Sequence, residues 1–326
     1  MNHHNQEKHG RVIAVQKNRF TIDWEGQELA ARLKGSFYEQ PSDQWPLVGD
    51  EVSFLYNPSG ESIIRSVGKR KSLLQRLDPI KTGAIQSMVA NVDDCFIVTA
   101  LNGDYNYNRI ARYVSLALQS GARPVIILTK ADLCADVERH IREVETLSDK
   151  LRVHAVSALQ GLGMEALEEY FVPGRTIALL GSSGAGKSTL INAVAGEEIM
   201  KTGAVRASDD KGRHTTTHRQ LIRLKNGASI IDTPGMRELG VAGAEEGIDD
   251  TFSDILVLAA SCRFRDCRHE TEPGCAVKAA IMRGQLREAR LALYQSLGAE
   301  NRGNRARMKE ISKRSKAYQK SKNKKN

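Results

Sequence analysis

The residues with the clearest chemical potential are nine in the middle of the chain, which read GSSGAGKST and fit the pattern G-x-x-x-x-G-K-[ST]. A glycine-rich turn exposes backbone N–H groups, and a helix that follows it adds the partial positive charge of its first turn. In such a loop the lysine, here Lys187, reaches the β- and γ-phosphates of a nucleotide, and the hydroxyl of Ser188 binds Mg²⁺. We therefore predict a phosphate-binding loop that consists of Gly181, Ser182, Ser183, Gly184, Ala185, Gly186, Lys187, Ser188 and Thr189.

Two further motifs follow predicted strands and suit the recognition of a purine base. The strand over residues 124–129 ends in the motif Thr129, Lys130, Ala131 and Asp132. A carboxylate at Asp132 accepts two hydrogen bonds from the N1–H and the N2 amino group of guanine, and adenine lacks that pair of donors. The aliphatic stem of Lys130 can lie over the base plane. The strand over residues 153–157 ends in Ser157 and Ala158, whose backbone N–H groups can meet the guanine oxygen.

A third strand, over residues 229–231, delivers Asp232, and Gly235 follows three residues later. Binding sites in parallel sheets form at the carboxyl ends of the strands, so we expect these residues to lie beside the phosphate loop. Asp232 is then placed to hold Mg²⁺, directly or through water, and the N–H of Gly235 can meet the γ-phosphate. Each short motif is weak alone, but together at strand ends they predict a guanine-nucleotide site.

A separate cluster of metal-ligand residues lies near residue 270. Three thiols and one imidazole fall within fourteen residues: Cys262, Cys267, His269 and Cys275. Four such ligands suit tetrahedral Zn²⁺ and leave no open coordination position. We therefore predict one structural Zn²⁺ that stabilises a small domain. The two isolated cysteines, Cys95 and Cys134, are expected to be ordinary core thiols.

Two kinds of pattern surround these motifs. Before residue 68, about five short strands alternate with turn signals, which predicts a small closed β-barrel of the OB type. From residue 92, buried strands alternate with amphipathic helices, which predicts βαβ units and a mostly parallel sheet. Residues 78–91 are interpreted as a linker. A helix is expected over residues 279–297, with Arg283, Arg287 and Arg290 on its outer face.

The net charge of +9 is concentrated at the C-terminus. Residues 302–326 contain eleven Lys and Arg and one acidic residue, so they carry +10 while the other 301 residues sum to −1. Such a run is typical of a disordered arm that either contacts nucleic acid or aids solubility. No apolar run approaches about 18 residues and the N-terminus resembles no signal peptide, so we expect a cytoplasmic protein without a membrane anchor.

The motifs resemble those of Ras-like GTPases, but in a rotated order, because the base-reading motifs precede the phosphate loop. This is the order of a circularly permuted GTPase. With a barrel in front and a cysteine cluster behind, the chain resembles the RsgA (YjeQ) family of bacterial small-ribosomal-subunit biogenesis GTPases. The resemblance implies GTP or GDP and Mg²⁺ as ligands, the small subunit and its rRNA as partners, and the four clustered residues as zinc ligands. It departs from the usual Asn-Lys-x-Asp form at Thr129, which can make one hydrogen bond where Asn makes two.

Two further expectations follow from the same resemblance. The Gly-rich polar segment 203–219 stands where these GTPases have a mobile switch, and one of Thr215, Thr216 and Thr217 should complete the Mg²⁺ shell, with Thr216 favoured. Met236 stands where Ras-like enzymes have the Gln that orients the attacking water, so unassisted hydrolysis should be slow. Either His214 supplies the water-positioning group when a partner orders the switch, or the partner supplies it.

The predicted organisation is an OB-type barrel (1–70), a linker (71–91), a permuted GTPase domain (92–240), a zinc-binding helical domain (241–300) and a basic disordered tail (301–326). The favoured function is a monomeric GTPase of small-subunit assembly that grips rRNA through barrel, zinc domain and tail. An alternative is an RNA-binding scaffold that binds GTP and barely hydrolyses it, and the barrel itself is either RNA-binding or purely structural. A third alternative is an ATPase, which is disfavoured because adenine lacks the pair of hydrogen-bond donors that the carboxylate of Asp132 would accept from.

Overall fold

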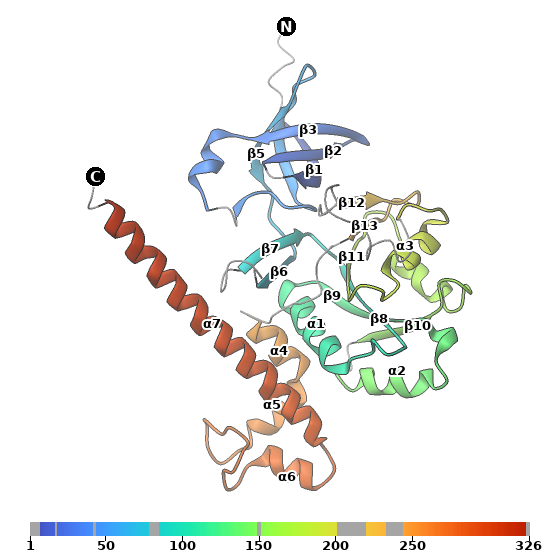
Figure 1. The fold of residues 1–326 in the computed structure, drawn as a ribbon, viewed down its shortest axis with the longest axis vertical. Helices are drawn as coiled ribbons and strands as arrows, with labels where there is room; N and C mark the ends of the chain where they lie inside the picture. Colours follow the sequence, from blue (N-terminus) through green and yellow to red (C-terminus); the bar gives the residue numbers. More distant parts are fainter. Residues whose placement is uncertain are drawn as a thin grey trace, which may run out of the picture.

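A computed structural model describes residues 7–16, 18–41, 44–77, 85–148, 151–200, 220–232 and 244–323. Figure 1 shows a β-barrel at one end, a sheet flanked by helices in the middle, and a group of helices at the other end, from which one long helix projects. The predicted order of barrel, α/β domain and helical domain is confirmed.

The N-terminal strands close into a five-stranded barrel. They are β1 (Glu7–Gln16), β2 (Arg19–Trp24), β3 (Gln27–Leu33), β4 (Glu51–Leu55) and β5 (Ser62–Val67), with a short 3₁₀ helix, η2 (Gly35–Glu39), after β3. The pairing runs β1-β2-β3-β5-β4 and returns from β4 to β1, and only β3 and β5 pair in parallel. Alternate residues such as Phe20, Ile22 and Phe54 fill the interior, as the period of two along a strand requires.

Part of the expected linker is folded. Strands β6 (Leu73–Leu77) and β7 (Ile85–Ala90) form an antiparallel hairpin between the barrel and the sheet. Leu74, Met88 and Val89 are buried in the large core that also contains α1, and the backbone of Val89 bridges to Val48 of the barrel region. The prediction of a plain linker over residues 71–91 was therefore wrong for residues 73–77 and 85–90, because burial of these apolar side chains stabilises strand pairing.

The middle domain is built on a largely parallel sheet. Its strands are β8 (Asp94–Ala100), β9 (Arg123–Thr129), β10 (Arg152–Val156), β11 (Thr176–Leu180), β12 (Gln220–Arg223) and β13 (Ser229–Asp232). The order is β10-β9-β8-β11-β13-β12, and β12 alone is antiparallel to its neighbour. The predicted parallel sheet is confirmed. At its edge β12 also pairs with β1 of the barrel, so one continuous eleven-stranded sheet runs through both domains.

Helices cover both faces of this sheet. The connecting helices are α1 (Tyr107–Ser120), η4 (Ala131–Leu133), α2 (Val137–Glu145), η5 (Glu165–Tyr170) and α3 (Lys187–Ala195). Ile97 and Leu128 pack with α1 and α2 on one face, while Phe96 and Ile127 pack with α3 and η5 on the other. Residues 131–133 and 165–170 form 3₁₀ helices, and α1, α2 and α3 alternate with the strands as predicted.

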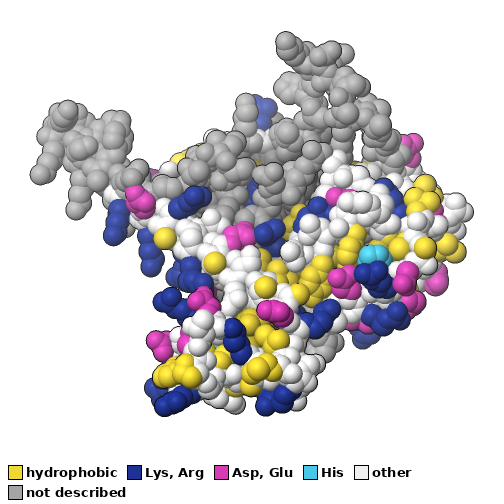
Figure 2. Space-filling model, turned by 60° about the horizontal axis from the view of Figure 1, so that its bottom comes forward, with side chains coloured by type: hydrophobic (Ala, Val, Ile, Leu, Met, Phe, Trp, Pro, Cys, Tyr) yellow, Lys and Arg dark blue, Asp and Glu magenta, His cyan; other side chains and the backbone are white. Residues whose placement is uncertain are grey.

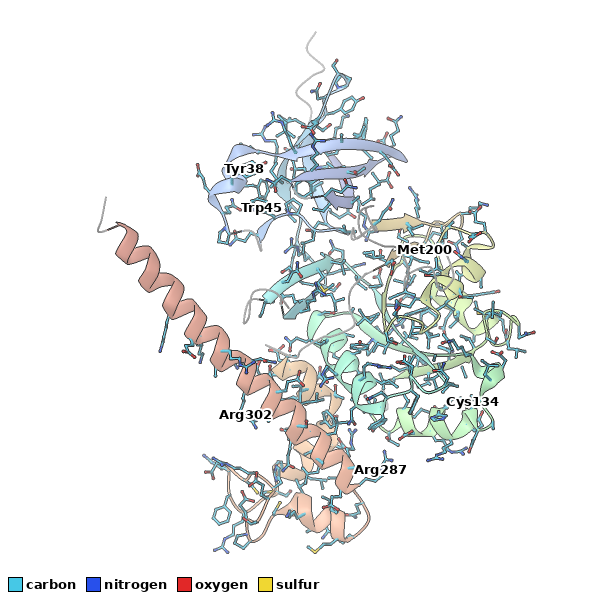
Figure 3. All side chains as sticks on the ribbon, viewed as in Figure 1. Tyr38, Trp45, Cys134, Met200, Arg287 and Arg302 are labelled. Carbon is cyan, nitrogen blue, oxygen red and sulfur yellow. The ribbon has the colours of Figure 1, made fainter. Side chains whose placement is uncertain are left out.

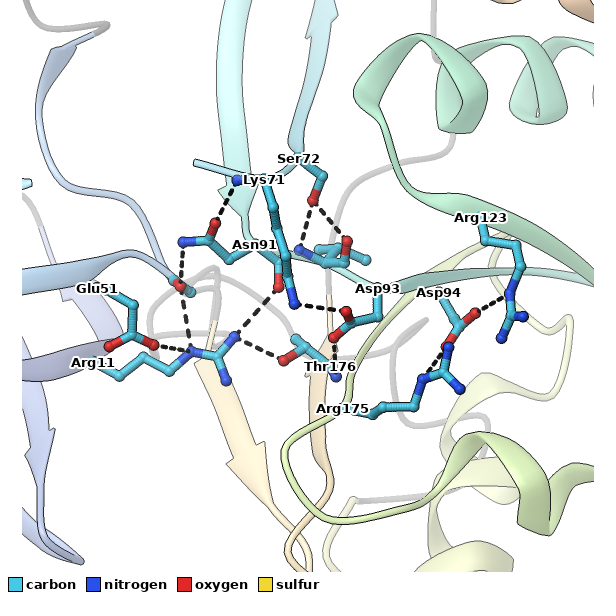
Figure 4. Close-up of polar contacts among 12 residues, drawn as sticks. Arg11, Glu51, Lys71, Ser72, Asn91, Asp93, Asp94, Arg123, Arg175 and Thr176 are labelled. Atoms are coloured by element: carbon cyan, nitrogen blue, oxygen red, sulfur yellow. Dashed lines mark hydrogen bonds and ion pairs between the residues drawn. The ribbon is translucent and has the colours of Figure 1, made fainter. Parts of the chain in front are cut away.

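Charged side chains tie the barrel, the hairpin and the sheet together (Figure 4). Arg11 of β1 donates a 2.7 Å hydrogen bond to the hydroxyl of Thr176, the first residue of β11. Asp93 accepts from the backbone N–H of Thr176 at 2.9 Å and from the ammonium of Lys71 at 2.6 Å. The next carboxylate, Asp94 at the start of β8, is fully buried and forms ion pairs with Arg123 at 2.6 Å and with Arg175 at 3.1 Å. Since these bonds converge on the start of β11, they hold the strand that leads into the phosphate loop.

The chain ends in four helices, α4 (Glu245–Thr251), α5 (Ser253–Ala259), α6 (Ala276–Met282) and α7 (Glu288–Asn323). The single helix expected over residues 279–297 is instead two helices, α6 and α7. Gly284, with φ +71°, lies between them and allows the chain to change direction. Among the helices of the described residues, none combines the length and apolar character needed to cross a lipid bilayer.

Two predictions for this region were wrong. Residues 301–323, expected to be disordered, continue α7, because Lys, Arg, Ala and Glu are good helix formers and the packed first turns of the helix provide its nucleus. Arg290, expected on the outer face, is only 6% exposed. Its guanidinium bonds to both carboxylate oxygens of Asp254 at 2.6 and 2.7 Å and to the carbonyl of Thr251 at 2.9 Å. Arg283 and Arg287 are exposed as expected.

Candidate nucleotide site and metal cluster

The phosphate loop leaves the centre of the sheet and enters a helix, as predicted. Strand β11 is buried along its whole length between β8 and β13, and α3 begins at Lys187. Gly181 has φ +152°, and a Cβ on it would lie 2.3 Å from the carbonyl oxygen of Val98. Only glycine therefore allows the loop to turn this close to β8. The first N–H groups of any helix have no partner within it, so the start of α3 presents donors to an anion.

The ammonium group of Lys187 lies within this loop. Its Nζ donates to the carbonyl oxygens of Gly181 at 2.8 Å and Ser182 at 2.6 Å. The remaining loop residues, Ser183, Gly184, Ala185 and Gly186, complete the turn, and Ser188 and Thr189 are half-buried in the first turn of α3. The arrangement combines one cation and a helix N-terminus in a single turn, which suits a phosphate chain.

The predicted base-reading residues lie beside this loop. Thr129 ends β9 and is paired in parallel register with Val156 of β10, so Ser157 lies at the same edge of the sheet. Lys130 adopts a left-handed conformation with φ +58°, which turns the chain into η4 and leaves Asp132 exposed at the rim. Ser157 is buried, and Ala158 is half-buried in the loop that follows.

Thr129 makes a contact that the sequence reasoning did not foresee. Its side chain is 3% exposed, and its hydroxyl donates a 2.6 Å hydrogen bond to the carbonyl oxygen of Ala185 in the phosphate loop. Gly186 lies against the same side chain, because a Cβ added there would be 3.3 Å from the threonine hydroxyl. In this structure Thr129 therefore joins the base-reading strand to the phosphate loop.

The predicted magnesium ligand Asp232 also reaches this edge. It ends β13 and faces Leu179 of β11 in register, two residues before the phosphate loop begins. Ser188, the other predicted Mg²⁺ ligand, starts the helix on the far side of the loop. The predictions for His214, Thr215, Thr216, Thr217, Gly235 and Met236 lie outside the described residues.

Sequence reasoning missed one acidic residue at this edge. Asp104 lies in the loop between β8 and α1, and its carboxylate accepts a hydrogen bond from the hydroxyl of Ser182 in the phosphate loop. Arg109, in the first turn of α1, forms an ion pair with Asp104 at 3.0 Å. A signal for Asp104 existed, since β8 is the neighbour of β11 and its carboxyl end opens on the same edge.

The four predicted metal ligands come together in the C-terminal helical region, in the segment between α5 and the start of α6. The donor atoms of Cys262, Cys267, His269 and Cys275 all lie within 4.8 Å of one another. His269 Nδ1 is 3.4 Å from Cys275 Sγ and 3.7 Å from Cys262 Sγ. A tetrahedral Zn²⁺ with thiolates at about 2.3 Å requires ligand separations of about 3.8 Å, so the donor set fits this metal.

The loop that carries His269 is shaped by Glu272. Its carboxylate accepts backbone N–H groups of Arg268 and Glu270 at 2.8 Å each and of Thr271 at 3.1 Å. The N–H donor of Arg268 contributes most to lowering the pKa of Glu272, to about 2. Backbone N–H groups of Ala276 and Lys278 point at the sulfurs of Cys262 and Cys275. The residues around the cluster are therefore arranged for thiolate ligands.

Comparison with known proteins agrees with this geometry. Residues 67–242 match the family model described as RsgA GTPase. The chain is 47% identical over 279 residues to the small ribosomal subunit biogenesis GTPase RsgA 2 of Listeria monocytogenes serotype 4b (strain F2365), covering 85% of this chain and 79% of the relative. It is 46% identical over 310 residues to RsgA 2 of Vibrio vulnificus (strain CMCP6), covering 93% and 86%.

Solved structures show the same fold. The crystal structure of YjeQ from Thermotoga maritima has a TM-score of 0.69 at 29% identity and covers 90% of this chain and 97% of that one. The structure of YloQ, described as a circularly permuted GTPase, has a TM-score of 0.62 at 24% identity and covers 96% and 98%, which supports the fold. The base-reading motifs, the phosphate loop and Asp232 thus stand in the order of a permuted GTPase, and the chain belongs to the RsgA GTPase family.

Proposed function

We propose that this chain is an Mg²⁺-dependent GTP hydrolase that acts in the late assembly of the small ribosomal subunit. The observation that carries the proposal is the meeting of four strand ends, those of β9, β10, β11 and β13, at one edge of the sheet. Asp132 follows β9, Lys187 follows β11 and Asp232 ends β13, which supports a single site at this edge. The relatives named above, at 46–47% identity, are biogenesis GTPases of that subunit.

In the proposed site the phosphate loop holds the triphosphate and Lys187 neutralises charge on the β- and γ-phosphates. Ser188 and Asp232 would hold Mg²⁺, which would supply positive charge beside the phosphates and stabilise the negative charge that develops during hydrolysis. Asp132 selects guanine, Lys130 covers the base, and the N–H groups at Ser157 and Ala158 meet the guanine oxygen.

The segments outside the described residues complete the proposal. Thr216 adds a ligand to Mg²⁺ in the triphosphate state, the N–H of Gly235 meets the γ-phosphate, and His214 positions the attacking water once a partner orders the switch. The supporting observation for His214 is chemical: Met236 cannot orient water, and the imidazole of His214 lies in the sequence directly before the three switch threonines.

We also propose rRNA contacts through the C-terminal helices and the barrel. Exposed basic side chains lie along α7. Figure 2 shows Lys and Arg side chains over the C-terminal helices. The exposed basic residues in this part of the helix include Arg302, Arg305, Arg307, Lys309 and Lys313. Figure 3 shows Arg302 on this helix, Arg287 directly before its first residue, and Tyr38 and Trp45 on the barrel. Tyr38 is half exposed, and exposed aromatic rings offer stacking surfaces for bases.

The remaining parts of the proposal concern the metal and the form of the protein. Cys262, Cys267, His269 and Cys275 hold one structural Zn²⁺, and the protein acts as a monomer in the cytoplasm. The metal contributes folding free energy to α5 and α6 and takes no part in hydrolysis, since four protein ligands fill its coordination shell.

The test is GTP hydrolysis by the full chain, with and without purified small subunits. We expect slow turnover alone, clear stimulation by subunits, and loss of both in Lys187→Ala. The rival function is an RNA-binding scaffold that holds GTP and barely hydrolyses it, favoured by Met236 in place of Gln. Turnover that subunits leave unchanged at the slow basal rate would favour that scaffold.

A further inference from the structure

The loop between β8 and α1, residues 101–106, lies beside the phosphate loop for a topological reason. Strands β8 and β11 are parallel neighbours, with Ile97 opposite Leu180, so both chains leave the sheet at the same edge. The phosphate loop turns against the carbonyl of Val98, and the β8–α1 loop then brings Asp104 to the hydroxyl of Ser182.

The geometry points to Asp104 as a positioning residue of the phosphate loop, with Arg109 neutralising its charge. This inference rests on the proposed nucleotide site and adds a residue to it. Asp104 bonds to Ser182 near the beginning of the phosphate loop, and Thr129 bonds to Ala185 further along it. The loop is thus fixed at two points before a nucleotide binds, which reduces the conformational entropy lost on binding.

Asp104 is itself held in place. Its backbone N–H donates to the side-chain oxygen of Asn102 at 3.0 Å, and the N–H of Tyr105 donates to the carbonyl of Asn102 at 3.0 Å. The N–H of Leu101 donates to the carbonyl of Thr129 at 2.8 Å, which ties the loop to the end of β9. A carboxylate on a fixed turn of this kind can define where Ser182 lies.

A carboxylate beside a phosphate site needs a compensating charge, because it would repel the nucleotide. Arg109 supplies it, with a guanidinium 3.0 Å from the carboxylate and a second bond to the backbone carbonyl of Asp104. Its position is set by the first turn of α1, where the side chain of Asn106 caps the N–H of Arg109 at 2.9 Å. The pair is formally neutral, so Asp104 can hold the loop without opposing the phosphates.

The test is GDP binding to the full chain by titration calorimetry, with KM and kcat for GTP measured beside it. Asp104→Ala should weaken GDP binding about tenfold, the loss of one charge-assisted hydrogen bond. Ser182→Ala should cause a loss of similar size, and the double variant should be no weaker than either single one, since both remove the same bond. Asp104→Asn keeps an acceptor and should bind within about threefold of the wild type.

The inference predicts a rise in KM with little change in kcat at saturating GTP, because the residue acts on binding and not on the transferred phosphate. If Asp104→Ala fails to fold, Ser182→Ala alone carries the test. Wild-type GDP affinity in both single variants, or additive losses in the double variant, would overturn the inference. Lys187→Ala separates this failure from that of the proposed site: normal GDP binding in Lys187→Ala means that the nucleotide site itself is misplaced.

Discussion

The hydroxyl of Thr129 donates a 2.6 Å hydrogen bond to the carbonyl oxygen of Ala185, which joins the last residue of β9 to the phosphate loop. The base-reading motif and the phosphate-binding motif are therefore in direct contact, although 56 residues separate them in the sequence. Thr129, in the first position of the base-reading motif, therefore has a structural role in addition to any hydrogen bond that it makes to the base.

This contact predicts the effect of Thr129→Val, which keeps the shape of the side chain and removes the hydroxyl. The buried carbonyl of Ala185 would lose its donor, at a cost of about 1–3 kcal/mol, so we expect a lower melting temperature and GDP affinity reduced by about fivefold or more. Calorimetry measures both quantities. Thr21→Val on the barrel strand β2 is the matched control and should leave GDP affinity unchanged. Equal affinity in Thr129→Val and wild type would contradict the prediction.

The choice of guanine over adenine should depend on Asp132. Asp132→Ala removes the acceptor of two guanine donors, so we expect GTP affinity to fall by about a hundredfold while ATP affinity stays low. The measurement is displacement of a labelled GDP by GTP and by ATP. Glu138→Gln, an exposed carboxylate in the first turn of α2, is the control and should retain guanine preference. The account of the base site collapses if ATP competes equally with GTP in the wild type.

The metal cluster predicts one zinc per chain. Cys267→Ser should release the metal and lower the melting temperature, because the free energy of metal binding is coupled to the folding of the helices around it. Metal content is read by a chromogenic chelator after denaturation, and stability by thermal unfolding. Cys134→Ser, at a cysteine away from the cluster, should keep one zinc. A wild-type zinc content in Cys267→Ser would show that the four residues do not act as one site.

The contact between α1 and α4 depends on Gly247. A Cβ at this position would lie 1.9 Å from the carbonyl oxygen of Ser115, and 2.9 Å from the side chain of Gln119. Gly247→Ala should therefore push α4 away from α1 and cost about 1–3 kcal/mol of stability. Gly303→Ala in α7, where nothing lies within 4 Å, should stabilise slightly through helix propensity. Unfolding curves of the two variants should move in opposite directions, and a Gly247→Ala protein as stable as wild type would refute the close packing.

The same α1–α4 contact bears on nucleotide control of subunit binding. Asp232 and the residues after it lead directly into α4, so a γ-phosphate that orders this segment would act on the attachment of the C-terminal helices. We expect the affinity for small subunits to differ between GDP and a non-hydrolysable GTP analogue. Co-sedimentation with subunits measures it, and equal affinity in both states would rule out this control.

Much of the fold follows from local patterns. Strands β2 and β3 and helix α1 lie in the regions where the sequence predicts strands and amphipathic helices, because inward-facing residues alternate along the strands and because Asn106 and Gly121 cap the helix at its two ends. The strand ends that carry the phosphate loop, Thr129–Asp132 and Asp232 were also predictable, since each motif has its own chemistry at a fixed spacing.

Two of the features that the sequence did not predict depend on contacts between segments that are far apart in the sequence. Arg290 looks like a surface charge by helical spacing, and its burial is possible only because Asp254, 36 residues away, pairs with it. Asp104 belongs to no familiar motif, and its contact with Ser182 arises from the pairing of β8 with β11. The helical tail was read from charge alone, whereas its conformation follows from the helix that precedes it.

The pairing of Ala14 in β1 with Gln220 in β12 affects how the protein can be dissected. A fragment that starts after the barrel would expose the outer edge of β12, with free N–H and C=O groups that invite pairing with a second molecule. Recombinant fragments cut there should self-associate, even with every motif intact. In the full chain β1 of the barrel covers this edge of β12. A recombinant fragment that contains the nucleotide site should therefore also include the barrel.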